Sequence, residues 1–302
     1  MSSAFTPFAD QMASSGGTEA AKEDPLRRAK QDMHNSDFAN AEEVLREFVE
    51  HEPNSADGLY LLGEVLMRRA QPKESLRIFT KAAAERRPTG EELRLVGLDY
   101  ILLEDYADAI RWLRRAAELS PNNADTWYSL GRAQYSNGDF SGAESSFRRA
   151  LVFDSQSMKV ENNLGLALAA QNQPERAMEA YRQAVALQNN TASQSEQPLL
   201  NLGILLIDQN RPQEASEELM RATVIAPTCA QCHEALGKAL VVLNRLPEAE
   251  KALETAVALE PSNPRFHYLL GRAYKRSGEM EKSRNELQRS AELYGSHSTP
   301  TR

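Results

Sequence analysis

The sequence is poor in several residue types, and each shortage excludes a class of protein. It has only two cysteines, so a small fold held together by a disulfide framework is excluded. No apolar run approaches the roughly 20 residues that a helix needs to cross a bilayer, so no membrane span is predicted. β-branched residues are sparse while alanine and leucine dominate, which favours helices over sheets.

The net charge bears on the kind of partner that the protein binds, and the N-terminal composition bears on its cellular compartment. The formal net charge is −8, whereas nucleic-acid-binding domains present a basic face, so a nucleic-acid partner is not expected. Residues 1–24 have neither the basic start nor the apolar core of an export signal. We therefore expect a cytoplasmic protein. A periplasmic or secreted one is the alternative if a signal has been removed from the chain.

Glycine recurs at a nearly constant spacing, each time directly after an apolar residue. Successive members of this series are 34 residues apart, with one interval of 38: Gly63, Gly97, Gly131, Gly165, Gly203, Gly237 and Gly271. Twelve residues after each glycine comes alanine or serine, and four residues later a large apolar residue, as in Ala143 and Phe147. Because helix axes approach to about 8–10 Å only at small residues, the spacing predicts two crossing helices per unit.

This pattern resembles the tetratricopeptide repeat, a 34-residue unit of two antiparallel helices. Pro121, Pro227 and Pro261 strengthen the resemblance, because they fall where the second helix of a unit ends. The resemblance implies an all-α fold, namely a right-handed α-solenoid of stacked antiparallel helix pairs. It also implies that first helices line a concave groove and that the end units are more polar. Ser283 and Ser290, which stand where inner units have alanine, fit a polar end.

The resemblance divides the chain into three parts. Residues 1–21 are predicted to be a disordered leader, residues 22–297 eight repeats, and residues 298–302 a disordered tail. Positions within a repeat are counted from the unit starts near Lys22, Ala56, Gly90, Ala124, Met158, Glu196, Ala230 and Pro264. The interval of 38 places four extra residues within 188–197. We interpret this segment as a longer polar turn, with a flexible joint between five and three repeats as the alternative.

Cys229 and Cys232 form a C-x-x-C-H motif with His233, and several readings of it remain open. The motif is the signature for covalent attachment of a c-type haem, with the histidine as iron ligand. However, His233 occupies the fourth position of its repeat, where Trp127 and other packing residues stand, which argues against haem. A disulfide or redox pair at the start of a helix is a second reading. Two unreactive thiols are the reading that the pattern favours. A metal site would also need His267, one repeat away, and is disfavoured.

No arrangement typical of an enzyme is present. The sequence has no glycine loop for phosphate, no H-E-x-x-H motif, and no serine–histidine pair in a motif context. Acidic pairs such as Glu42-Glu43 are expected on outer helix faces. We therefore expect a non-enzymatic protein without a cofactor.

The remaining candidate site is the concave groove. In the family, positions 2, 5, 6, 9, 12 and 13 of each unit face it; here these positions hold eleven basic and seven acidic residues, although the whole chain is acidic. The predicted groove residues are Arg94, Tyr128, Arg132, Tyr135, Asn163, Asn201, Lys238, Tyr268, Arg272 and Lys275. Asn163 and Asn201 share position 6, which resembles the asparagine ladder in the repeats of O-linked N-acetylglucosamine transferase, where amides hold a peptide backbone.

These features favour a protein-interaction scaffold. Its groove is expected to bind an extended or helical segment of another protein, and we expect that segment to contain acidic residues. A redox or haem protein based on Cys229 and Cys232 is one alternative. A self-assembling array of the chain itself, and hence a homo-oligomer, is another.

Overall fold

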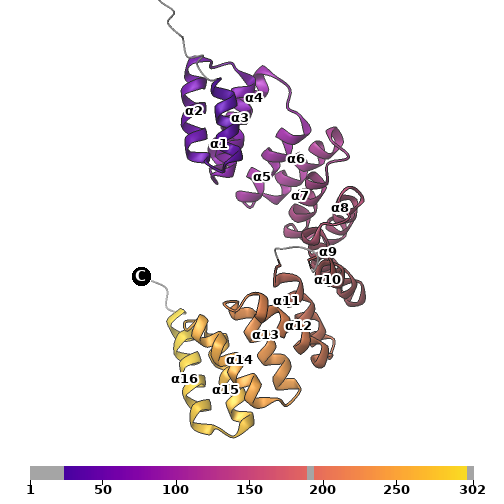
Figure 1. Ribbon diagram of the computed structural model, residues 1–302, viewed down its shortest axis with the longest axis vertical. Coiled ribbons are helices and arrows are strands. Elements are labelled where there is room, and N and C mark those ends of the chain that lie inside the picture. The colour runs from indigo at the N-terminus through magenta and orange to yellow at the C-terminus, as the bar shows by residue number, and fades with distance from the viewer. Residues whose placement is uncertain (1–23, 189–193, 298–302) are drawn as a thin grey trace, which may run out of the picture. The chain divides into compact units, whose positions relative to one another are not determined.

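The computed structural model describes residues 24–188 and 194–297, and these are helical almost throughout. They contain sixteen helices (Figure 1). By its contacts the chain divides into two compact units, Met1–Arg87 and Pro88–Arg302. The first unit holds α1 (Pro25–His34), α2 (Phe38–His51), α3 (Ala56–Arg68) and α4 (Pro72–Glu85). The second unit holds α5 (Gly90–Leu102), α6 (Tyr106–Leu119), α7 (Ala124–Ser136), α8 (Phe140–Phe153), α9 (Met158–Ala170), α10 (Pro174–Gln188), α11 (Gln197–Asp208), α12 (Pro212–Ile225), α13 (Ala230–Val242), α14 (Leu246–Leu259), α15 (Pro264–Ser277) and α16 (Met280–His297).

Side-chain caps mark where the first helix begins in six of the eight repeats, and α9 and α11 lack such a bond. Ser55, Thr89 and Asn123 each accept a hydrogen bond through the side chain from a backbone N–H of the first turn. Such caps satisfy donors that have no partner within the helix. Most first helices consequently begin at the residue that the 34-residue spacing predicts, including Ala124 and Ala230.

A left-handed residue separates the two helices of every repeat, always at position 15. Six of these residues are not glycine, with φ between 56° and 62°: Ser36, Ala70, Glu104, Asn172, Asn210 and Asn244. Gly138 and Gly278 take the same place in two repeats, with φ of 81° and 87°. A left-handed residue with a Cβ costs roughly 1–2 kcal/mol, so Ala70 and Glu104 carry strain that glycine avoids.

The seven periodic glycines lie at the crossing point of the two helices, as predicted. A Cβ added to Gly131 would lie 2.6 Å from Cε1 of Phe147, and one added to Gly165 would lie 2.5 Å from Cε1 of Tyr181. In every case the obstructing side chain is the large residue sixteen positions later. The glycine therefore creates the space that the second helix fills.

The serines of the last repeat are not a polar outer surface, which corrects the sequence interpretation. Ser283 and Ser290 are almost fully buried. The Ser283 hydroxyl donates to the carbonyl of Gly271 at 2.8 Å, and the Ser290 hydroxyl donates to the carbonyl of Pro264 at 2.8 Å. Each serine fills an alanine-sized site because its hydroxyl finds a backbone acceptor on the first helix of its own repeat.

Within the second unit, the first helices are the ones that approach each other. α5 contacts α7, α7 contacts α9, and the series continues through α11 and α13 to α15, while neighbouring second helices lack comparable contact (Figure 1). First helices therefore form the inner face of this unit. One apolar core continues from Ala143 in α8 to Ala252 in α14, with members on both sides of the 188–197 segment. Residues 189–193 lie outside the described residues, so the joint proposed there stays a prediction.

Replacing Glu161 with glutamine is expected to stabilise the chain at neutral pH. Burial raises the pKa of this carboxyl and the charge of Glu179 adds to the shift, although Arg148 opposes it. Because the folded chain binds this proton more tightly than the unfolded chain, the group favours folding below its ordinary pKa of 4.5 and loses that contribution as the pH rises. We expect Glu161→Gln to gain about 0.5 kcal/mol or less at pH 7. Urea unfolding at pH 7 and pH 4 checks this, since the gain must shrink at the lower pH.

Candidate functional site: the first-helix groove

A pocket of about 390 Å³ lies on the first-helix face of the second unit, formed by α11, α13 and α15. Its eleven lining residues all occupy the repeat positions predicted to face a groove: Gln197, Leu200, Asn201, Ile204, Ile207, Asp208, Gln231, Glu234, Ala235, Lys238 and Arg265. Asn201 and Lys238 are the predicted site residues among them.

The pocket has an apolar strip bordered by side-chain amides. Ile204 is 44% exposed, which is unusual for isoleucine in a closely packed array. Beside it, the Gln197 amide donates to Asn201 Oδ1 at 3.1 Å, and the Asn201 amide donates to Asn162 Oδ1 at 2.9 Å. The amides therefore form a chain that extends from α11 to α9.

This chain differs from the predicted asparagine ladder. Asn201 pairs with Asn162, while Asn163 donates to the backbone carbonyl of Lys159 in its own helix at 2.7 Å. The two predicted rungs are thus not brought together. Asn162 and Gln197 occupy groove positions, but nothing in their sequence context distinguished them from other polar residues.

Several cations of the groove have acceptors within the chain, which the count of basic residues did not indicate. Glu234 is almost fully buried and forms ion pairs with Lys238 Nζ at 2.7 Å and with Arg265 Nη2 at 2.9 Å. Arg276 donates to the carbonyl of Val241 at 2.7 Å and to Asn244 Oδ1 at 3.2 Å.

Arg272 and Lys275 remain as exposed cations on α15. Neither forms an ion pair with any described residue. The Arg272 guanidinium instead lies 5.8 Å from the ring centre of Tyr268, which is itself 45% exposed. This end of the groove therefore combines an accessible aromatic ring with net positive charge.

A second cluster of predicted residues lies on α7 and α9. Lys159 Nζ lies 4.9 Å from the Tyr128 ring centre and pairs with Asp125 at 3.1 Å, and the Arg132 guanidinium lies 5.9 Å from the same ring. Tyr128 is only partly exposed because it also packs against the Phe147 ring.

The other two predicted residues, Tyr135 and Arg94, contact residues close to them in the sequence. Tyr135 packs against Phe140 with ring centres 5.3 Å apart, so it is a packing residue more than a free anchor. The Arg94 side chain is largely covered and pairs with Glu91 in its own helix.

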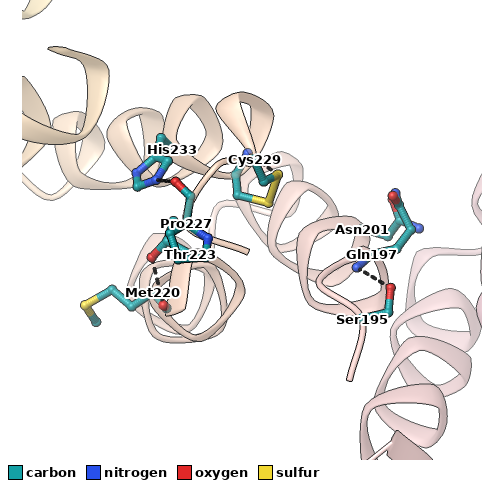
Figure 2. The surroundings of a disulfide bond; sticks show 9 residues. Ser195, Gln197, Asn201, Met220, Thr223, Pro227, Cys229 and His233 are labelled. Carbon is teal, nitrogen blue, oxygen red and sulfur yellow. Dashed lines mark hydrogen bonds between the residues drawn. A yellow bond between two sulfur atoms is a disulfide. The ribbon is translucent and has the colours of Figure 1, made fainter. Parts of the chain in front are cut away.

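Cys229 and Cys232 are joined by a disulfide, which was the second reading of the motif, so the favoured reading of two unreactive thiols was wrong. Figure 2 shows this bond at the start of α13, with His233 Nε2 directed at the carbonyl of Pro227, 3.0 Å away. Trp127 and His267 make the same contact six residues back, to Pro121 and Pro261, at 2.8 and 3.0 Å. His233 therefore holds a turn between repeats, and the haem reading fits neither its contact nor the bonded sulfurs.

Residues 24–188 and 194–297 hold neither a cluster of metal ligands nor a membrane-spanning helix. No group of three or more histidine, cysteine, aspartate or glutamate side chains there has the arrangement of a metal site. No helix within those same ranges is both long enough and apolar enough to cross a membrane.

Comparison with curated proteins identifies repeat-containing relatives over parts of the chain. "Small glutamine-rich tetratricopeptide repeat-containing protein 2" of Saccharomyces cerevisiae is 27% identical over 112 residues, which are 37% of this chain and 32% of that protein. "Superkiller protein 3" of the same organism is 30% identical over 71 residues, covering 24% of this chain and 5% of that protein. The chain therefore matches a third or less of the length of these relatives.

Solved structures share the fold at low sequence identity. A structure from a study of Pseudomonas aeruginosa pilF has a TM-score of 0.60 at 21% identity, covering 68% of this chain and 92% of that one. The Cut9–Hcn1 complex of APC/C gives 0.58 at 17% identity, covering 93% of this chain and 54% of that one. YrrB, described as "a TPR protein with an unusual peptide-binding site", has a TM-score of 0.52 at 18% identity, covering 61% of this chain and 93% of that one.

Family models cover most of the chain and agree with the helix pairs. A model described as "Tetratricopeptide repeat" matches residues 26–91, 162–228 and 234–298. Related models described as "TPR repeat" and "Tetratricopeptide repeat" match residues 97–138 and 124–156. The chain belongs to the tetratricopeptide repeat family.

Proposed function

We propose that this chain is a non-enzymatic scaffold that binds an extended segment of another protein along α11, α13 and α15. One observation carries the proposal: every residue lining the 390 Å³ pocket occupies a groove position of three successive repeats. The exposed Ile204 side chain offers an apolar contact, and the amides of Gln197 and Asn201 can donate to and accept from a peptide backbone.

The charge pattern supports an acidic residue in the bound segment. Glu234 pairs with both Lys238 and Arg265, and Asp208 adds a second negative charge to the lining, so the charged residues of the pocket sum to zero. Arg272 and Lys275 lie on the next first helix and are exposed, so a segment that continues along the groove meets positive charge there. We therefore expect an apolar residue over Ile204 and an acidic residue toward α15.

Ile204→Lys tests the groove. A display library of random twelve-residue peptides is selected on the wild-type chain, and the recovered peptides are measured by fluorescence anisotropy. We expect micromolar binding that Ile204→Lys weakens by about tenfold or more, because a buried anchor contact is lost.

Val224→Lys is the matched control. Val224 is 78% exposed on α12, the second helix of the same repeat, and lines a separate hollow with Met220. Loss of binding in Val224→Lys with full binding in Ile204→Lys would overturn the groove assignment. Circular dichroism verifies that both variants remain helical.

The acidic preference has its own test. Charge reversal at Arg272 and Lys275 together is expected to weaken binding of acidic peptides by about tenfold and to flatten its salt dependence. Full binding of acidic peptides by this double variant would contradict the acidic preference and leave recognition to the apolar contact and the amides.

A further inference from the structure

The two cysteines occupy a place where the fold does not need sulfur. Cys229 is the N-cap of α13, and its Sγ accepts a hydrogen bond from the backbone N–H of Cys232 at 3.1 Å. Other first helices make the same cap with an oxygen, from Ser55, Thr89 or Asn123. Oxygen is a stronger acceptor than sulfur, so capping alone does not explain a cysteine here.

The two cysteines differ in exposure. Cys232 is fully buried in the core that continues through α11 and α13, whereas Cys229 is only partly covered at the turn. Figure 2 shows the bonded pair at the tip of the helix, where the chain enters α13. An incoming thiolate is therefore expected to attack at Cys229, the cysteine with exposed surface, and not at Cys232.

The N-terminus of α13 also favours negative charge on Cys229. A thiolate at an N-cap accepts hydrogen bonds from first-turn N–H groups and lies at the positive end of the helix dipole. The contact between Cys229 Sγ and the Cys232 N–H already supplies one such donor. Reduction thus converts a weak sulfur cap into a stronger, charged one, which compensates for the lost covalent bond.

We propose that the Cys229–Cys232 disulfide is a thiol–disulfide exchange site that accepts two electrons from a dithiol in another protein. A partner thiolate attacks Cys229 Sγ; the bond between the two sulfurs breaks, and Cys232 leaves as a thiolate that takes up a proton. The second partner thiol, as its thiolate, then attacks the partner sulfur of the mixed disulfide and releases the Cys229 thiolate. The partner is oxidised to a disulfide and this chain is reduced to a dithiol. Groove binding is not required for this reaction.

Single-cysteine variants test which sulfur reacts. Cys229→Ser gives α13 an oxygen cap like the one that Ser55 gives α3, and it retains Cys232 as the single cysteine. Cys232→Ala retains Cys229 as the single cysteine. We expect the folded Cys232→Ala chain to react with Ellman's reagent at least about a hundredfold faster than folded Cys229→Ser, because access and thiolate fraction both favour Cys229. In denaturant the two rates should converge. Equal rates in the folded chains would overturn the proposal.

The wild-type chain tests the electron transfer. The oxidised chain is mixed anaerobically with a synthetic peptide that carries two cysteines, and thiols on both molecules are counted by alkylation and mass spectrometry. We expect the peptide to lose two thiols for every two gained by this chain, while the helical signal is retained. A disulfide that opens only after the chain is unfolded would instead be a structural crosslink, and a chain isolated with two free thiols under air would contradict the proposal as well.

Discussion

Replacing Phe147 with alanine is expected to lower the free energy of unfolding by about 3–5 kcal/mol. Phe147 is fully buried in α8, and its ring fills the space above Gly131 of α7. Removing the ring leaves a cavity between two helices that otherwise contact closely. Urea unfolding followed by circular dichroism measures the loss. Val152→Ala, on an exposed part of the same helix, is the matched control and should change stability by no more than about 0.5 kcal/mol.

Gly131→Ala tests the cause of this effect. The added Cβ would lie 2.6 Å from Phe147 Cε1, so the single variant is expected to cost about 1–3 kcal/mol from overpacking. In the double variant, Gly131→Ala with Phe147→Ala, the methyl group at position 131 enters the space that the Phe147 ring has left. The double variant should therefore lose less than the sum of the two single losses. Strict additivity would show that the glycine is not there to accommodate the ring.

His267→Ala is expected to destabilise the last repeat by about 2–3 kcal/mol. His267 is almost fully buried, with Nδ1 2.6 Å from Glu286 Oε2 and Nε2 3.0 Å from the carbonyl of Pro261. Its ring thus connects α15 to α16 and to the preceding turn. Alanine removes both contacts and leaves the Glu286 carboxylate without this partner.

Hydrogen exchange localises the effect. Amides of α15 and α16 should exchange faster in His267→Ala, while those of α7 and α8 keep their protection. Tyr268→Ala, at the neighbouring and 45% exposed residue, is the control and should leave exchange nearly unchanged. Uniform acceleration along the whole chain would mean that the last repeat is not an independent unit of stability.

The helix pairs were predictable because their determinants are local and repeat. Each periodic glycine specifies a close crossing, and the large residue sixteen positions later fills it, as Phe147 does for Gly131. N-caps such as Asn123 then determine where a helix begins. Both kinds of signal depend on a few neighbouring residues, so no long-range information is needed.

The candidate site was less predictable because it depends on side-chain partners. Glu234 pairs with Lys238 four residues away and with Arg265 in the next repeat, so two cations of the expected basic cluster share one carboxylate. Asn201 likewise takes Asn162 as its hydrogen-bond partner, and its position in the repeat did not reveal this.

The left-handed turn at Glu104 was also missed, since no sequence preference indicates it.

The pattern of helix contacts has a consequence for how the chain folds. Within each unit, a helix makes its main contacts with helices of its own repeat and of the adjacent ones. Such short sequence separations keep the entropy cost of loop closure low, which favours fast folding of each helix pair. Any repeat can nucleate and its neighbours can add in turn. The early repeats are therefore expected to form during synthesis, before the ribosome has released the last ones.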